Sequence, residues 1–314
     1  MTIECDHLIL GAGLRGLRAA LTRQSVNPDA AIVLVDAAPQ PGGSTRTQRS
    51  NGFSCELGRF AFTRDEIAPL LDRLNPAPQP VESRTPSGSL FDGVRLVEVD
   101  VEPKPVSFRS GNEELTQACR RQLGPCLQLG RAAAAVSPID GGWEITLTGE
   151  VETLIRTRHL TVCLPVDRAA DLFGEFDPAL AGMRPHLTRE PQAFAFLGGL
   201  AADCADLRGY GIVPADGIET PVAETIFCSN VFPGRGLADR FLLRSEITGA
   251  AAAATDDDVI ATTVAELRRW TGHTGTFGFT KVHRFERIAR DAAWTECRIR
   301  LRGLASRCAN LDFE

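Results

Sequence analysis

The sequence lacks the features of several classes of protein. No apolar run approaches the roughly 20 residues of a membrane-spanning helix, and the start, MTIECDHLIL, has neither the basic residues nor the long apolar core of a signal peptide. The nine cysteines form no CxxC pair and no Cys/His spacing typical of zinc, which favours reduced, structural thiols. We therefore predict a cytoplasmic protein without stable membrane insertion.

An excess of positive charge is also missing. The formal net charge of the 314 residues is -6, which argues against nucleic acid as a partner and leaves a small molecule as the expected ligand. The five histidines form no triad and no metal pattern, so we predict no metal site and identify no catalytic residue from the sequence. Sixteen phenylalanines are available to line an apolar pocket.

Glycines cluster near the start of the chain. The segment HLILGAGLRGLRAAL runs from an apolar strand into helical spacing, with Gly11, Gly13 and Gly16 forming the pattern GxGxxG. The first glycine permits a tight turn, the second lets the backbone approach a pyrophosphate, and the third lets the helix pack closely on the strand. The backbone of Ala12 and Leu14 belongs to the same predicted dinucleotide site. A purely structural turn is the alternative.

An acidic residue follows the glycines at the distance that such a site needs. The second apolar run, AIVLVD, ends at Asp36, 25 residues after Gly11. A carboxylate at the end of the second strand can accept a hydrogen bond from a ribose 2′-hydroxyl and would repel the 2′-phosphate of NADP. Strand, helix and strand together predict a right-handed βαβ unit over a parallel sheet.

The residues after the second strand narrow the choice of dinucleotide. DAAPQPGGSTRT supplies Gly42, Gly43 and Arg46, and NGFSCELG supplies Glu56 and Gly58. This succession resembles the FAD-dependent amine oxidase superfamily, most closely its protoporphyrinogen-oxidase-like branch. The resemblance implies FAD as the cofactor. It also implies an α/β fold: a Rossmann-like FAD/NAD(P)-binding domain with a parallel central sheet, plus a reduced α+β substrate domain.

The resemblance further implies roles for single residues. In the family the GG-arginine segment lies along the FAD pyrophosphate and the flavin edge, which implies similar contacts for Gly42, Gly43 and Arg46, since arginine suits phosphate. A glycine-rich surface loop with a solvated arginine is the alternative. Glu56 is expected at the cofactor, or else as a structural carboxylate bonded to nearby backbone. Ala133 stands where the family usually has valine near the adenine, so its contact would come from the backbone.

The motifs also divide the chain into segments. We expect the FAD-binding domain in residues 1–75 and 106–170, a loop or reduced insertion at 76–105, the substrate domain at 171–285, and a return to the FAD-binding domain at 286–314. Because the family has a much longer stretch in place of the insertion, we expect a smaller or more open substrate cavity.

The end of the sequence departs from the family pattern. In the family, a strand like CANLDF leads into a G-[DN] turn and a helix that meets the flavin end of FAD. The sequence stops at Glu314, where that turn would begin. We therefore expect that a protein partner or a second subunit completes the flavin site, that FAD binds weakly, or that redox activity has been lost.

Three functional hypotheses follow. The first is an FAD-dependent oxidoreductase that removes hydride from a small or largely apolar substrate, with dioxygen or another acceptor reoxidising the flavin. The second is a non-catalytic flavoprotein-like subunit that keeps the dinucleotide-binding fold without a complete flavin site. The third, an NAD-dependent dehydrogenase, accounts for GxGxxG and Asp36 but leaves the GG-arginine and E-x-G segments unexplained.

Overall fold

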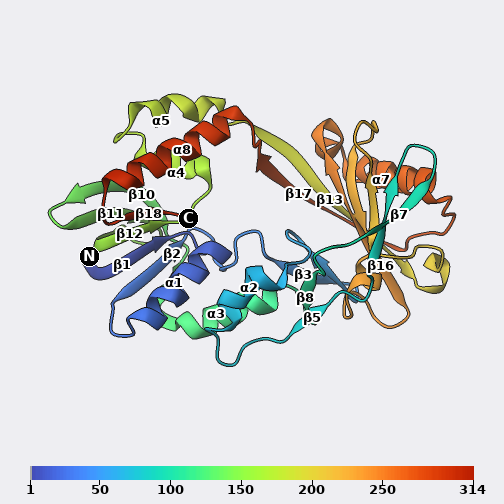
Figure 1. Cartoon of the computed structure of the whole chain (residues 1–314), viewed down its shortest axis with the longest axis horizontal. Helices are drawn as coiled ribbons and strands as arrows, with labels where there is room; N and C mark the ends of the chain where they lie inside the picture. The colour runs from blue at the N-terminus through green and yellow to red at the C-terminus, as the bar shows by residue number, and fades with distance from the viewer. Residues whose placement is uncertain (1) are drawn as a thin grey trace.

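Two seven-stranded sheets form the framework of the molecule. The computed structural model describes residues 2–314, and the two sheets lie toward opposite ends of it (Figure 1). The first sheet consists of β1 (Thr2–Leu10), β2 (Ile32–Asp36), β9 (Leu127–Leu129), β10 (Ala132–Ile139), β11 (Gly142–Thr148), β12 (Thr153–Val162) and β18 (Leu311–Phe313). The second consists of β6 (Ser87–Phe91), β7 (Leu96–Asp100), β13 (Arg189–Leu200), β14 (Gly211–Pro214), β15 (Val222–Ile226), β16 (Arg240–Thr248) and β17 (Phe279–Ile288).

The first sheet has a parallel centre. Its strand order is β10-β11-β12-β1-β2-β9, and β18 pairs with β12. Strand β1 runs parallel to both β12 and β2, and β2 runs parallel to β9, whereas β10, β11 and β12 form an antiparallel meander. The GxGxxG segment therefore follows a central strand, at the carboxyl edge of a parallel sheet, where ligands of open α/β sheets bind.

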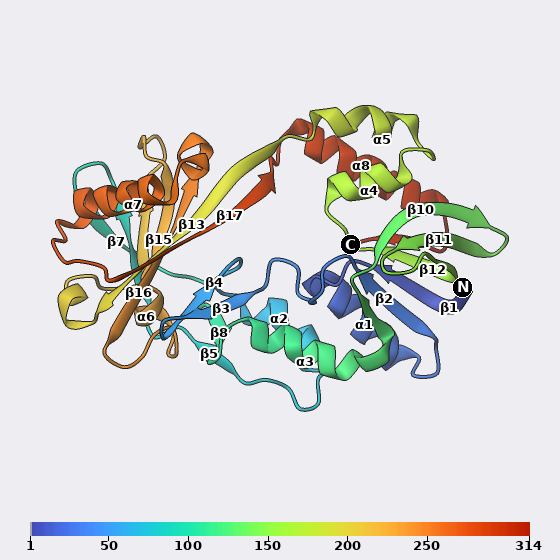
Figure 2. The same cartoon turned by 180° about the vertical axis from the view of Figure 1, so that it is seen from behind.

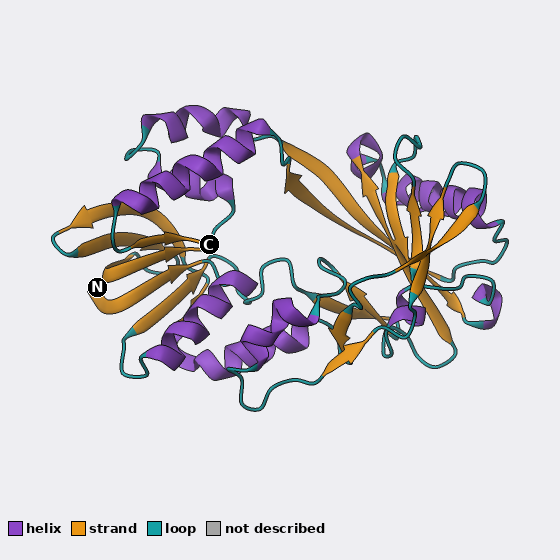
Figure 3. Cartoon of the chain, in the orientation of Figure 1, coloured by secondary structure: helices purple, strands orange, loops and turns teal. Residues whose placement is uncertain are grey.

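Helices cover both faces of the first sheet (Figure 3). The side chains of β1 alternate, so Leu8 and Leu10 face one core and Ile9 faces the other. The Ile9 core holds α1 (Leu14–Val26), α2 (Arg64–Leu71) and α3 (Glu113–Leu123), and the Leu8 core holds α4 (Val166–Phe173), α5 (Pro178–Met183) and α8 (Ala292–Arg307). Burial on both faces explains why the predicted strands read as continuous apolar runs.

The second sheet is mixed, in the order β17-β13-β16-β15-β14-β6-β7. On one face, α7 (Asp256–Thr271) packs over the odd-numbered residues of β13, including Ala193 and Ala195. The even-numbered residues, including Phe194 and Phe196, lie on the opposite face with the short helix α6 (Cys228–Val231). Two small antiparallel sheets of two strands each lie between the large sheets (Figure 2). One pairs β3 (Thr47–Ser50) with β4 (Phe53–Glu56), and the other pairs β5 (Pro80–Glu82) with β8 (Val106–Phe108).

The structure refines the expected segments. Residues 76–105, expected as a loop or reduced insertion, contain β5 and the β6–β7 hairpin, which extends the second sheet. Residues 171–187, expected in the substrate domain, instead pack on the first sheet, because Phe173, Leu180 and Leu187 are buried in its core. Four short 3₁₀ turns complete the chain: Gly124–Cys126, Arg184–His186, Ala202–Cys204 and Gly249–Ala253.

Candidate cofactor and substrate site

Two of the three glycines in GxGxxG are required by packing. Gly11 has a φ of +99°, and a Cβ there would lie 2.8 Å from the carbonyl oxygen of Cys163. A Cβ on Gly16 would lie 1.8 Å from the carbonyl oxygen of Gly11, so no larger residue lets α1 approach β1 this closely. Both positions therefore serve the tight turn and the helix–strand contact that the sequence pattern predicts.

Gly13 has a different environment. Its φ is −67°, which any residue can adopt, and a Cβ there would have nothing within 4 Å. Gly13 is the N-cap of α1, yet it makes no side-chain capping bond, and the first turn holds no acidic residue. The first N–H groups of the helix therefore lack both an intrahelical partner and a capping side chain next to open space, an arrangement that suits an anion.

Asp36 holds the turn from the side of the second strand. Its carboxylate accepts hydrogen bonds from the backbone N–H of Ala12 at 2.6 Å and from that of Ala38 at 2.8 Å. A carboxylate can accept about four hydrogen bonds, so lone pairs remain for a ligand hydroxyl. The backbone of Arg131 also bonds to the Asp36 carbonyl at 2.9 Å, and Ala133 follows two residues later, half-buried on β10.

The second glycine pair lies directly on the first loop. The backbone N–H of Gly42 donates to the carbonyl of Ala12 at 2.7 Å, and Gly13 and Gly42 form a parallel bridge. Gly43 has a φ of +60°, and its Cβ would lie 3.3 Å from the Cα of Gly13. The structure thus brings two glycine-rich segments, separate in the sequence, into backbone contact beside the uncapped start of α1.

The segment after Gly43 leads from this turn to a cavity of about 1100 Å³ between the first domain and the second sheet. Gly58 packs tightly here, since its Cβ would lie 1.9 Å from the carbonyl oxygen of Ser44. Arg46 is exposed, lines the cavity and forms no ion pair with any carboxylate of residues 2–314. The structure therefore brings together Gly13, Gly43 and Arg46 at one end of the cavity.

Glu56 lies outside the cavity lining, in a buried polar cluster. It accepts hydrogen bonds from the hydroxyl of Thr47 at 2.9 Å and the backbone N–H of Asn112 at 3.0 Å, and it forms an ion pair with Arg235 at 3.2 Å. Burial raises the pKa of Glu56, and the charge of Arg235 and the two hydrogen bonds oppose part of that rise. These contacts match the structural alternative for Glu56.

The far wall of the cavity is the face of the second sheet that α7 leaves uncovered. This wall carries the aromatic rings of Phe60, Phe194, Tyr210 and Phe285, and both acidic and basic side chains lie among them. Arg244, almost fully buried, donates to Glu224 at 3.1 Å and to the carbonyl of Gly58 at 2.5 Å, and its guanidinium lies 4.2 Å from the centre of the Phe194 ring. The lining is thus mixed, with charged groups beside the aromatic rings.

His283 lies on the same wall. Burial lowers its pKa, and the charges of Lys281 and Arg46 lower it further, so the imidazole is neutral near pH 7. Burial also raises the pKa of Tyr210, so its hydroxyl stays protonated. Sequence analysis missed both residues and Arg244. For Arg244 and His283 the sequence held a signal: polar residues recur at every second position within the predicted strands RFLLRSEITG and TKVHRF.

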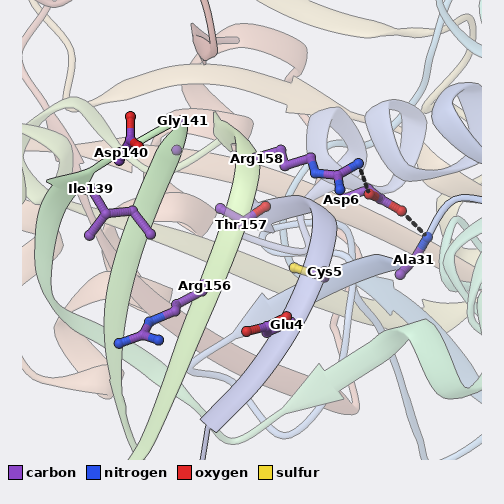
Figure 4. A pocket seen from close by; sticks show the side chains of 11 residues that line it. Glu4, Cys5, Asp6, Ala31, Ile139, Asp140, Gly141, Arg156, Thr157 and Arg158 are labelled. Atoms are coloured by element: carbon purple, nitrogen blue, oxygen red, sulfur yellow. Dashed lines mark hydrogen bonds and ion pairs between the residues drawn. The ribbon is translucent and has the colours of Figure 1, made fainter.

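A second pocket, of about 300 Å³, lies at the amino ends of β1 and β12, opposite the glycine turn (Figure 4). Its lining includes an ion pair between Arg158 and Asp6 at 3.2 Å, and Asp6 also accepts the backbone N–H of Ala31 at 2.9 Å. Ligands of open α/β sheets bind at the carboxyl edge. We therefore assign the site to the larger cavity.

Two kinds of feature are absent from the described part of the chain. No group of three or more His, Cys, Asp or Glu side chains in residues 2–314 is placed to hold a metal ion. None of the helices in that range is long and apolar enough to cross a membrane. The cysteines nearest the site are poor nucleophiles, because burial raises the pKa of both Cys55 and Cys163 to about 12.

Comparisons with known proteins agree with this geometry. Residues 9–74 match the family model for an NAD(P)-binding Rossmann-like domain, and no curated protein sequence matches the chain. A protein assigned as a protoporphyrinogen oxidase from Exiguobacterium sp. 255-15 is similar in structure, with a TM-score of 0.78 at 14% identity over 99% of this chain and 93% of that one. Cyclohexylamine oxidase from Brevibacterium oxydans IH-35A gives 0.74 at 10% identity, over 98% and 92%.

A third structure, reduced UDP-galactopyranose mutase, gives a TM-score of 0.77 at 13% identity, over 98% of this chain and 89% of that one. At these identities the likeness establishes the fold. The prediction of a Rossmann-like α/β domain with a second domain is therefore confirmed. The names of the similar proteins include two oxidases and a mutase, so the fold alone does not define the reaction.

Replacing Gly16 by alanine should destabilise the protein by about 1–3 kcal/mol, because the new Cβ would have to displace the backbone of Gly11. Gly13→Ala is the matched control, since its Cβ enters open space at an ordinary φ, and its effect should stay within about 0.5 kcal/mol. Denaturant unfolding of both variants measures the difference. Equal stability of the two would contradict the packing role of Gly16.

Replacing Arg235 by methionine should cost about 3–5 kcal/mol of unfolding free energy, because it leaves the Glu56 carboxylate buried without its cation. The pKa of Glu56 should then rise further. Because the pKa of Glu56 is then higher in the folded state than in the unfolded chain, the folded protein keeps a proton that the unfolded chain has lost. The free energy of unfolding should therefore fall as pH rises from the unfolded-state pKa through the folded-state pKa of Glu56. Unfolding across pH checks this, and the Glu56→Gln/Arg235→Met double variant should recover part of the loss. A pH-independent loss would count against the ion pair.

Proposed function

We propose that the protein is an FAD-dependent oxidoreductase that removes hydride from a small molecule. The observation that carries the proposal is the open space at Gly13 beside the uncapped start of α1. Packing explains why positions 11 and 16 are glycine, but nothing within the chain requires a glycine at position 13. A ligand that approaches the backbone there supplies the missing reason.

The residues around this space fit the parts of FAD. Asp36 has lone pairs to accept ribose hydroxyls, after its bonds to Ala12 and Ala38. The free N–H groups at the start of α1 and the backbone of Gly42 and Gly43 suit the diphosphate. Arg46, without a carboxylate partner among residues 2–314, would add positive charge where this segment enters the cavity.

The cavity would hold the reacting end of the cofactor and the substrate. FAD, when bound, supplies the hydride acceptor. The chain's own contribution is to bind and orient the substrate. Phe194 and Phe285 would contact its apolar part, and the Arg244–Glu224 pair would contact a polar group. His283, neutral near pH 7, is placed to accept a proton from the substrate. The lining therefore favours a substrate that combines an apolar body with a polar group.

The visible spectrum of the purified protein tests the proposal. We expect the absorbance bands of an oxidised flavin, with FAD released on denaturation, or uptake of added FAD by the colourless protein. The spectrum and a fluorescence titration with FAD are the measurements. A colourless protein that takes up no FAD would favour the non-catalytic alternative.

Replacing Gly13 by valine should abolish FAD retention while leaving the fold intact, because the side chain would occupy the space proposed for the diphosphate. Gly278→Val is the matched control, since Gly278 also has nothing within 4 Å of its Cβ position but lies away from the turn, directly before β17. The readouts are FAD content and thermal unfolding. Unchanged FAD content in Gly13→Val would refute this placement of the diphosphate.

A further inference from the structure

Helix α8 carries a row of positive charge. Trp294, Arg298 and Arg302 follow one another at intervals of four on α8 and so share one face of the helix, and Arg290 precedes the helix. The Trp294 ring is flanked by two of the arginines, with the guanidinium of Arg298 4.6 Å and that of Arg290 5.7 Å from the ring centre. We call these four residues the α8 arginine row.

The arginines of the row are not neutralised by their surroundings. Arg290, Arg298 and Arg302 form no ion pair with any carboxylate in residues 2–314. Two acids from α8 and the end of β18 have other partners: Glu296 pairs with Arg300 at 2.9 Å, and the side chain of Glu314 pairs with Arg18 at 2.8 Å.

The charges of the row also crowd one another. Desolvation, and then the guanidinium groups of Arg302, Arg15 and Arg290, lower the pKa of Arg298. Arg15 belongs to the first turn of α1, and its guanidinium donates to the backbone oxygen of Glu314 at 2.5 Å. Glu314 directly follows β18, and β18 packs against α8. The row is therefore a concentrated positive feature near the start of α1, in a chain whose formal net charge is -6.

The position of the row links it to the cavity. Arg290, at one end, lines the cavity between the two domains. From there α8 crosses the first domain on the face opposite α1, α2 and α3 (Figure 2). With a rise of 1.5 Å per residue, the helical part of the row, from Trp294 to Arg302, extends about 12 Å, and Arg290 lies beyond it. A single small anion cannot contact charges spread over this length, whereas a protein surface can.

We propose that the α8 arginine row is the docking surface for an acidic electron-carrier protein that takes electrons from the cavity. This inference rests on the proposed function, because only a redox protein has electrons to deliver. Charge complementarity supports an acidic partner, and arginine and tryptophan are the residues enriched at protein interfaces. The net negative charge of the remaining surface would repel such a partner elsewhere and so orient it on the row.

A nucleic acid fits the row less well. The Trp294 ring already packs against Arg298 and Arg290, so it is not free to stack on a base. The docked reaction balances in electrons and protons. The substrate would give up a hydride and a proton, which together amount to two electrons and two protons. FAD, when bound, would supply the hydride acceptor, two one-electron carriers would take one electron each, and the two protons would pass to water.

Binding to a plant-type [2Fe–2S] ferredoxin, an acidic one-electron carrier, tests the docking surface. Calorimetry at low and at high salt would compare the wild-type protein with Arg298→Gln/Arg302→Gln. We expect the double variant to bind about tenfold more weakly at low salt and to show a smaller salt dependence. Arg120→Gln/Arg121→Gln is the matched control, since these two arginines likewise form no ion pair within residues 2–314 but lie on α3, in the opposite helix layer. This control should bind as the wild type does.

Several outcomes would overturn the inference: no ferredoxin binding at low salt, equal binding by Arg298→Gln/Arg302→Gln, or an equal loss in the α3 control. Binding to vesicles of anionic lipid through the row, without ferredoxin binding, would assign it to a membrane surface instead. FAD content, measured on the same samples, separates the two proposals. A protein that holds FAD but does not bind ferredoxin refutes the docking surface alone, and one that binds ferredoxin without FAD refutes the proposed function alone.

Discussion

The close backbone packing where β1 meets α1 is the constraint on which the site depends. Gly16 lets the helix approach the carbonyl of Gly11, where a Cβ would lie 1.8 Å away. This contact fixes the start of α1 at the carboxyl edge of the parallel sheet. The Gly42–Ala12 hydrogen bond of 2.7 Å then holds the second glycine loop beside it. Together they leave an uncapped helix start next to open space, which is the feature that a diphosphate requires.

The segment from Gly42 to Gly58 connects this turn to the second domain. At its start it bonds to the first loop, and at its end the carbonyl of Gly58 accepts from Arg244 of β16 at 2.5 Å. Arg235, from the loop before β16, reaches back to Glu56 and to the hydroxyl of Ser107. One short segment therefore positions the proposed cofactor site and the cavity wall relative to each other. The buried ion pair at Glu56 supports the site without lining it.

Much of the first domain could be predicted from the sequence because its signals are local. GxGxxG, the apolar strands and the acid at Asp36 lie within one βαβ unit, where spacing along the chain sets spacing in space. At the start of α2, Thr63 and Glu66 form a capping box, which is likewise set by residues close together in the sequence. The cavity wall was harder to predict. Arg244 and His283 belong to strands about 40 residues apart in the sequence, and only sheet pairing through β13 brings them to one face.

The sequence by itself determined the glycine turn, the parallel strands around it and the resemblance to flavin amine oxidases, because these depend on residue type and short spacing. Tertiary structure decided which glycine faces open space, that Glu56 is bonded within the protein, and that the cavity is charged as well as aromatic. It also placed residues 171–187 on the first sheet and left Arg298 and Arg302 of α8 without a carboxylate partner among residues 2–314. These properties depend on what packs against each side chain, and in a folded chain those neighbours come from distant parts of the sequence.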